Sequence, residues 1–157
     1  MQVYKVLLTA ILFAAGCSNH TTMKDKYNIY AFRLRPGEDL KKGIEKQVLD
    51  HHIRAGWIAT CVGSLTRYNI RFANQPDSAS GEGHFEIVSL AGTLSANGPH
   101  LHISISDSTG KTIGGHLMDG NIVYTTAEII IATTDKYQFT REKDGTTAWD
   151  ELQVKEN

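Results

Sequence analysis

Hydrophobic and polar residues alternate along most of the chain with a period of two, the pattern of β-strands. It first appears over residues 27–35 and stops at Pro36. Further on, the same pattern returns in short segments separated by turns rich in glycine, asparagine and aspartate. The additional predicted strands are residues 57–64, 65–73, 84–95, 100–106, 111–117, 121–132, 137–142 and 149–154.

A helical pattern occupies residues 38–54. Leu40, Ile44 and Val48 recur at a spacing of four and form an apolar stripe. Glu38 supplies negative charge at the expected start, where it opposes the helix dipole favourably. One helix packed on a large, mostly antiparallel sheet predicts the α+β class.

The first residues differ from the rest of the chain. Residues 1–17 combine a short apolar run with a final Gly-Cys pair, which is typical of a secretory signal. The end of this segment resembles a bacterial lipobox, in which Cys17 would carry a lipid and anchor the protein to the cell envelope. Alternatively, the protein starts at Met23 and is cytoplasmic. Residues 18–26 are a predicted linker, and residues 27–157 a single domain.

Composition narrows the functional classes. The chain has 157 residues, 41% of them hydrophobic, and a net charge of −1. It can therefore build a core, and it lacks the basic excess that usually marks nucleic-acid binding. Its cysteines, Cys17 and Cys61, do not form a disulfide framework or a cysteine zinc site. We expect Cys61 to be a buried, inert thiol.

The candidate chemistry lies with three histidines. Alternation after residue 99 directs Leu and Ile to the core and His100 and His102 to the opposite face. Gly110 ends a Ser-Thr-Gly sequence that fits a three-residue hairpin loop with a left-handed glycine. This register pairs His102 with His116 and gathers the three imidazoles on one face, where opposed Cβ atoms lie about 4.5–5.5 Å apart.

Other arrangements remain open. A two-residue turn would shift the register by one and point His116 to the core, unless a bulge at Gly114 and Gly115 restored it. In the three-residue register, three neutral imidazoles form a zinc ligand set with a fourth position open. Nickel, copper and iron also accept imidazole ligands. The alternative to a metal site is a solvated polar strand face.

Four motifs occur in order along the chain: FRLRPGEDL at 32–40, GHFEIVSLAGTLS at 83–95, HLHISISDSTGKTIGGHL at 100–117 and TAEIII at 126–131. Together they resemble the PPC domain (plants and prokaryotes conserved, also written PCC), here in its stand-alone prokaryotic form. The resemblance covers most of the predicted domain.

This resemblance implies a mostly antiparallel sheet with flanking helices and a homotrimeric assembly. It also implies that His100, His102 and His116 are metal ligands. Plant members carry the domain beside an AT-hook, an Arg-Gly-Arg-Pro element that enters the DNA minor groove, and bacterial members are often labelled DNA-binding for that reason. This sequence contains no such element, so DNA as a partner is implied by kinship alone.

Two acidic residues are candidates to support a metal site. Glu86 and Glu128 could accept an imidazole N–H or act as a base near a metal-bound water. Both alternate with apolar neighbours, so an ion pair with Arg33, Arg35 or Arg54 is the alternative. No serine has an identifiable triad partner, and we expect a binding protein rather than an enzyme.

Three functional hypotheses follow. The first is a homotrimeric DNA-binding or regulatory protein of the PPC family with a three-histidine site for zinc or another divalent transition metal. The second is a metal-dependent enzyme of unknown substrate. The third is an envelope lipoprotein that binds a small ligand and contacts the membrane through the lipid on Cys17.

Overall fold

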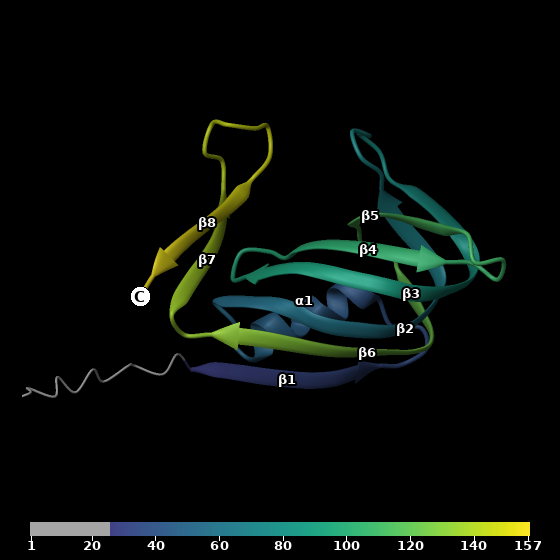
Figure 1. Cartoon of the computed structure of the whole chain (residues 1–157), viewed down its shortest axis with the longest axis horizontal. Coiled ribbons are helices and arrows are strands. Elements are labelled where there is room, and N and C mark those ends of the chain that lie inside the picture. The colour runs from purple at the N-terminus through teal and green to yellow at the C-terminus, as the bar shows by residue number, and fades with distance from the viewer. Residues whose placement is uncertain (1–25) are drawn as a thin grey trace, which may run out of the picture.

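The computed structural model of the protein describes residues 26–157 (Figure 1). Its elements are β1 (Tyr27–Leu34), α1 (Leu40–Asp50), β2 (Ala55–Arg71), β3 (Ala79–Ser95), β4 (His100–Ser106), β5 (Thr112–Leu117), β6 (Ile122–Thr134), β7 (Tyr137–Glu142) and β8 (Glu151–Glu156). The predicted α+β class, a mostly antiparallel sheet with one helix, is confirmed.

The N-terminal predictions fall outside this range. The signal-like residues 1–17, Cys17 and the alternative start at Met23 are not among the described residues, so both hypotheses about the N-terminus stay predictions. Within residues 26–157, no helix is long and apolar enough to cross a membrane.

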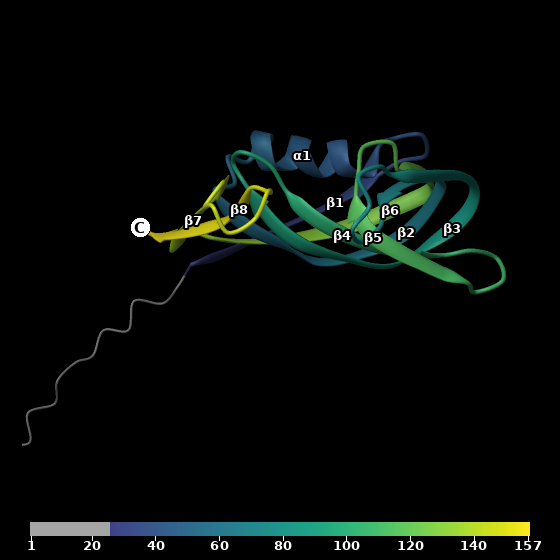
Figure 2. The same ribbon diagram turned by 90° about the horizontal axis from the view of Figure 1, so that it is seen from above.

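Six strands form one antiparallel sheet in the order β1-β6-β2-β3-β4-β5. The end of β2 also reaches β5, where Ile70 lies opposite Leu117 and Arg71 opposite His116. This second pairing closes β2, β3, β4 and β5 into a ring. The helix α1 covers one face of the sheet, and β7 and β8 form a separate hairpin at one end (Figure 2). The sheet face away from α1 is therefore available for a functional site.

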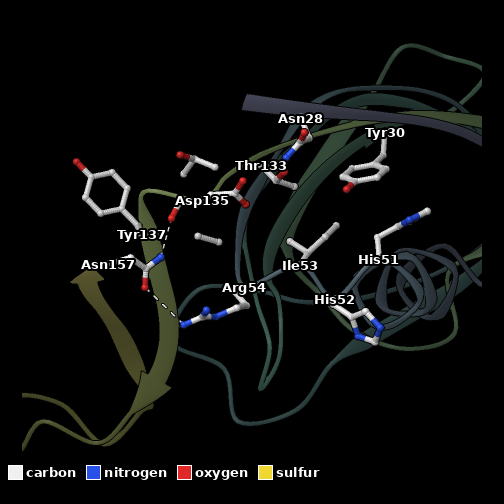
Figure 3. A pocket seen from close by; sticks show the side chains of 12 residues that line it. Asn28, Tyr30, His51, His52, Ile53, Arg54, Thr133, Asp135, Tyr137 and Asn157 are labelled. Atoms are coloured by element: carbon white, nitrogen blue, oxygen red, sulfur yellow. Dashed lines mark hydrogen bonds between the residues drawn. The ribbon is translucent and has the colours of Figure 1, made fainter. Parts of the chain in front are cut away.

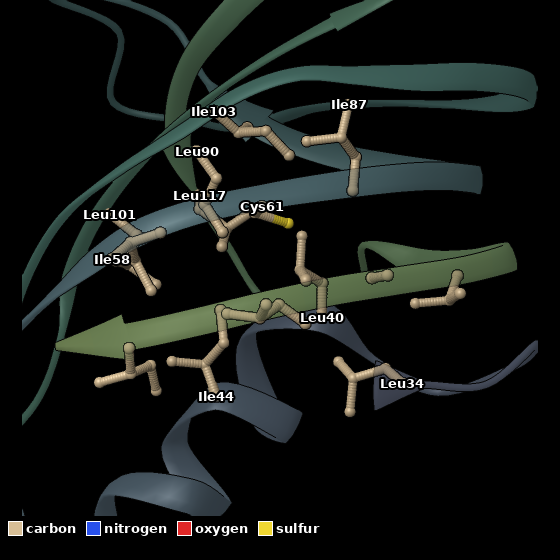
Figure 4. Packing of buried hydrophobic residues seen from close by; sticks show 14 of the residues in the cluster. Leu34, Leu40, Ile44, Ile58, Cys61, Ile87, Leu90, Leu101, Ile103 and Leu117 are labelled. Carbon is tan, nitrogen blue, oxygen red and sulfur yellow. The ribbon is translucent and has the colours of Figure 1, made fainter. Parts of the chain in front are cut away.

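The core lies between α1 and the sheet (Figure 4). Leu40 and Ile44 project from the helix and are fully buried, and they belong to the same buried cluster as Leu101 and Ile103 of β4. Burying side chains of this size stabilises the fold by roughly 1.5–3 kcal/mol each. Cys61 is buried in the same core, and burial raises the pKa of its thiol to about 12. The expectation that Cys61 is buried is confirmed.

The helix is shorter than residues 38–54. Asp39 caps its start by accepting a hydrogen bond from the backbone N–H of Lys42 at 3.2 Å. At the other end, His52 adopts a left-handed conformation with φ 51°, and the N–H of Ile53 donates to the carbonyl of Val48 at 2.9 Å. The turn returns Ile53 to the core, which extends the apolar pattern beyond the helix itself.

The long strand β2 replaces two predicted strands. Bulges after Ile58, after Gly63 and after Leu65 interrupt its pairing with β6. Each bulge changes which residues face the core, because the side-chain period of a strand is two. The alternation of hydrophobic and polar residues is therefore broken in the sequence, although the strand continues through the bulges.

The strand β3 also begins earlier than predicted, at Ala79. This start lies within residues 74–83, which separate the predicted strands 65–73 and 84–95 and are rich in small and polar residues. In this part of the strand Tyr68 lies opposite Gly81. A Cβ atom on Gly81 would come within 2.7 Å of the Tyr68 ring. The small residues that indicated a loop are thus needed where an aromatic ring crosses the strand.

The hairpin between β4 and β5 has the predicted three-residue loop. The N–H of Asp107 donates to the carbonyl of Lys111 at 3.0 Å, and the N–H of Gly110 donates to the carbonyl of Asp107 at 2.9 Å. Gly110 has φ +82°, in the left-handed region. His102 is directly opposite His116. The three-residue register is confirmed, and the register with a two-residue turn is wrong.

We predict that Gly110→Ala lowers the free energy of unfolding by about 1–2 kcal/mol, the usual cost of a left-handed conformation for an L-residue. Nothing lies within 4 Å of the added Cβ, so the loss comes from backbone conformation alone. Urea unfolding measures it. Gly110→Asn is the control, and it should lose less because asparagine tolerates this conformation. Equal stability of all three proteins would contradict the turn.

Candidate metal centre

Three histidines from two neighbouring strands converge on the sheet face away from α1. His102 on β4 and His116 on β5 are directly opposed, and His100 lies two residues before His102 on the same face. One ring nitrogen from each residue lies within 4.8 Å of the corresponding atom in the other two. The Nε2 atoms of His100 and His102 are 3.2 Å apart. The predicted gathering of the imidazoles is therefore present.

Close strand packing next to His116 depends on glycine. A Cβ atom on Gly114 would lie 2.8 Å from the carbonyl oxygen of Ile103, and one on Gly115 would lie 2.5 Å from that of Arg71. Any larger residue would therefore push β5 away from β4 on one side or from β2 on the other. The glycine pair allows His116 to approach the other two histidines.

Burial holds two of the rings in the neutral form. It lowers the pKa of His116 to about 4, with a further contribution from the charges of His100 and Arg71. Burial also lowers the pKa of His100, and the positive charge of Arg141 acts in the same direction. A neutral imidazole keeps a lone pair that can bind a metal cation.

The donor set fits a transition metal. Tetrahedral zinc with Zn–N bonds of about 2.0–2.1 Å places two ligating nitrogens about 3.3 Å apart, close to the 3.2 Å between His100 and His102. The Nδ1 atom of His116 is buried and has no hydrogen-bond partner among the described residues. Leaving a buried polar atom unpaired costs about 1–3 kcal/mol, and a metal bound to that atom would remove the cost.

A cavity of about 500 Å³ is lined by His116 together with Lys41 and Glu45 of α1. Two further cavities adjoin the histidines. One, of about 380 Å³, is lined by His100 and His116, and the other, of about 350 Å³, by His100 and His102. The hairpin of β7 and β8 contributes Arg141 and Glu151 to both. The cluster is therefore bordered by space large enough for a small ligand.

The Plants and Prokaryotes Conserved (PCC) domain profile matches residues 21–135. The chain belongs to the PCC family. This match confirms the resemblance carried by the four sequence motifs, and it includes all three histidines of the cluster.

The chain is also similar to individual proteins. It is 39% identical over 126 residues to the bifunctional protein GlmU of Synechococcus sp. (strain JA-3-3Ab), a match that covers 80% of this chain and 20% of that protein. The chain thus spans about a fifth of that relative. A hypothetical protein from Salmonella enterica of known structure is 38% identical, with a TM-score of 0.82 over 85% of this chain and 96% of the other.

More distant structures share the fold. A metal-containing protein from Archaeoglobus fulgidus is 24% identical, with a TM-score of 0.68 over 80% of this chain and 93% of the other. Proteins from Bacteroides thetaiotaomicron and Ralstonia eutropha, both with provisional DNA-binding names, are 20% and 23% identical, each with a TM-score of 0.70.

The PCC fold does not bring Glu86 or Glu128 to the histidines. Glu86 is opposite Ser106, four residues along β4 from His102, which is about 13 Å. Glu128 is on β6, opposite Arg33, and β2 and β3 separate β6 from β4. In the described part of the chain, neither glutamate hydrogen-bonds a histidine or forms the alternative ion pair with an arginine.

Other residues occupy the surroundings of the cluster. The charge of Glu151 acts on His100 and opposes the lowering of its pKa. Arg71 lies opposite His116, and its guanidinium carbon is 4.8 Å from the centre of the Trp149 ring. Sequence analysis did not identify these residues, because only the β2–β5 pairing and the folded-back hairpin bring them to the histidines.

A separate cavity of about 260 Å³ lies beside β1, the end of α1 and the last residue (Figure 3). Its polar groups largely contact one another. The His51 ring stacks on Tyr30 with ring centres 4.3 Å apart, and Arg54 donates to the side chain of Asn157 at 3.5 Å. Asn157 in turn donates to the carbonyl of Asp135 at 2.6 Å. Among the described residues, the metal-ligand group is at the histidine cluster instead.

We predict a pH-dependent stability of the metal-free protein that His116 controls. The pKa of this ring is about 4 in the folded chain, below its ordinary value of 6.5. Between these two pH values His116 is protonated in the unfolded chain but not in the folded chain. The free energy of unfolding therefore falls as the pH drops from 6.5 towards 4. Above 6.5 this contribution is constant.

Urea unfolding with a chelator present, at about pH 7 and about pH 5, measures this effect. His116→Gln should lose less stability between the two pH values than the unmodified chain. His84→Gln is the control, because His84 is an exposed strand histidine outside the cluster. The same pH response in all three proteins would contradict the role of His116.

Proposed function

We propose that this PCC protein binds one divalent transition-metal ion per chain through His100, His102 and His116, with zinc as the first candidate. The observation that carries the proposal is the convergence of three ligating nitrogens within 4.8 Å. Three histidine ligands leave a coordination position for a small ligand or water. When bound, the metal supplies a fixed positive charge and a Lewis acid at the edge of the adjoining cavities.

Support for this proposal comes from the neutral state of His100 and His116 and from the unpaired Nδ1 of His116. The distant relative described as metal-containing agrees with it. The proposal is a binding function. A catalytic role would need a base at the metal, and the two glutamates considered for that role lie elsewhere.

The observations favour a small ligand over DNA at this site. The net charge of the chain is −1, and the cavity beside the histidines contains Asp150 and Glu151 as well as two arginines. A DNA-binding surface gains most of its affinity from uninterrupted positive charge facing phosphates. The acidic residues would repel the backbone in the region where the histidines are exposed.

We predict that the purified protein retains about one zinc ion per chain after dialysis and that His102→Ala loses it. Mutating a residue that only hydrogen-bonds a metal ligand typically lowers metal affinity by about 10–100-fold. Loss of a ligand itself should therefore weaken zinc binding by at least about 100-fold. Metal analysis and competition with a chromophoric chelator measure the change. His84→Ala is the control, since His84 is also a strand histidine but its ring contacts Tyr124 instead, with ring centres 4.3 Å apart. Equal zinc content in all three proteins would refute the site.

The trimer implied by family membership is part of the proposal. Several large apolar side chains are exposed on the sheet face away from α1, among them Ile29 at 62%, Val62 at 55% and Val88 at 58%. Exposed large apolar side chains are the groups that an assembly would gain most by burying. The face that carries the histidines therefore also has the surface that an assembly would bury.

We predict that the protein elutes with the mass of three chains and that Val62→Glu dissociates it, because a charge would be buried in the interface at a cost of several kcal/mol. Light scattering coupled to size-exclusion chromatography gives the mass. Leu49→Glu is the matched control: Leu49 is equally exposed, at 66%, but lies on α1. A monomeric unmodified chain, or a Val62→Glu trimer, would exclude this interface.

A further inference from the structure

We propose that the cavity between the histidine cluster and the β7–β8 hairpin binds a small organic carboxylate with an apolar body. The carboxylate is held by the guanidinium groups of Arg71 and Arg141, and the apolar body packs on Trp149. The inference rests on the proposed metal centre, because His100 and His116 line the same cavity and a bound metal would add to its positive charge.

Arg71 and Arg141 both have guanidinium N–H donors without a hydrogen-bond acceptor among the described residues. The guanidinium of Arg71 is at 4.8 Å from the Trp149 ring centre and makes one long hydrogen bond, of 3.5 Å, to the carbonyl of Gln75. Arg141 donates to the carbonyl of Asp150 at 2.6 Å. Among the described residues, neither arginine forms an ion pair. Each guanidinium has five N–H donors in a planar fork that matches a carboxylate.

Both arginines surround the same histidine. Arg71 on β2 and Arg141 on β7 line the same cavity as His100 and His116, so the two guanidinium groups reach the cluster from different elements. Neither guanidinium forms an ion pair with the acidic residues of this cavity, so the two cations still repel each other across it. An anion between them would remove this repulsion and occupy their remaining donors.

The position of Arg141 is fixed by the backbone. Its N–H donates to the side-chain oxygen of Asn97 at 3.0 Å, and the Asn97 amide donates back to its carbonyl at 2.9 Å. Asn97 lies in the turn just before β4, which carries His100. These reciprocal bonds hold the hairpin against the turn, so part of the site is arranged before a ligand arrives.

The other residues of the cavity indicate a carboxylate with an apolar body rather than a multiply charged anion. Asp150 and Glu151 also line it, and Glu151 accepts a hydrogen bond from the hydroxyl of Thr147 at 2.5 Å. These two negative charges would repel a dianion such as sulfate more than a monoanion. Trp149 and Met118 provide apolar surface, and Trp149 remains 60% exposed although it is a large aromatic side chain.

The hairpin lies beyond residues 21–135, the part of the chain that matches the PCC domain. Arg141 and Trp149 therefore reach the histidine site from a part of the chain outside that match. We infer from this that the metal ligands belong to the domain and that the preference for a carboxylate is set by the hairpin.

The test uses the fluorescence of Trp149. The chain has two tryptophans, so the variant Trp57→Phe leaves Trp149 as the single reporter. The zinc-loaded variant is titrated with benzoate, with benzamide as the uncharged analogue and with sulfate as the dianion. We expect a saturable change with benzoate and at least about 10-fold weaker binding of benzamide and sulfate, since charge-assisted bonds are roughly twice as strong as neutral ones.

Arg71→Gln and Arg141→Gln, each in the Trp57→Phe background, should weaken benzoate binding by about 10-fold or more. Arg67→Gln is the matched control, an exposed arginine on the same strand as Arg71, and it should bind benzoate normally. Calorimetry repeats the comparison without the fluorescent reporter, and circular dichroism establishes that each variant is folded.

Metal analysis of the same samples separates this inference from the proposed function. A zinc-loaded chain that shows no saturable response to benzoate, binds benzamide or sulfate as tightly, or is unaffected by both arginine substitutions overturns the carboxylate site and leaves the metal centre standing. A chain that takes up no zinc overturns the proposed metal centre, and the carboxylate inference falls with it.

Discussion

The register between β4 and β5 is the constraint on which the candidate site depends. His102 lies opposite His116 because Ile105 lies opposite Ile113 in the same hairpin. A slip by one residue would turn His116 towards the core and expose the apolar face of β5. Burying each large apolar side chain is worth roughly 1.5–3 kcal/mol, so the core that stabilises the sheet also holds the histidines together.

The arrangement that gathers the rings also makes them suitable ligands. Removing His116 from water disfavours its charged form and lowers its pKa to about 4. The partly buried imidazoles of His100 and His116, which have few hydrogen-bond partners, destabilise the folded chain slightly when nothing is bound. A cation reverses this effect, because it satisfies lone pairs that the protein leaves unpaired. In this way the free energy of folding and the affinity for a metal are linked.

The local features of the site were predictable, and the distant ones were not. Alternation in β4 and the glycine at position 110 are sufficient to place the histidines on one face, because a tight hairpin fixes its own register. The sequence did not predict that Arg71, Arg141 and Glu151 lie beside the histidines. They reach the cluster only through the β2–β5 pairing and the folded-back hairpin. Glu86 shares the histidine face, since it lies opposite Ser106, but alternation gives the face of a residue and not its distance along the strand.

The division of the site between domain and hairpin bears on how such a centre acquires a specific ligand. The histidines lie within residues 21–135, the part that matches the family, whereas Arg141 and Trp149 lie beyond it. A fold commonly hosts different functions through the segments that border its site. Here the β7–β8 hairpin is fixed to the domain, because the Asn97 side chain both accepts a hydrogen bond from the backbone N–H of Arg141 and donates one to its carbonyl. Asn97 lies next to the start of β4. A change in the hairpin would therefore act on the ligand cavity and on the position of His100 together, so the metal site and its ligand preference are mechanically coupled.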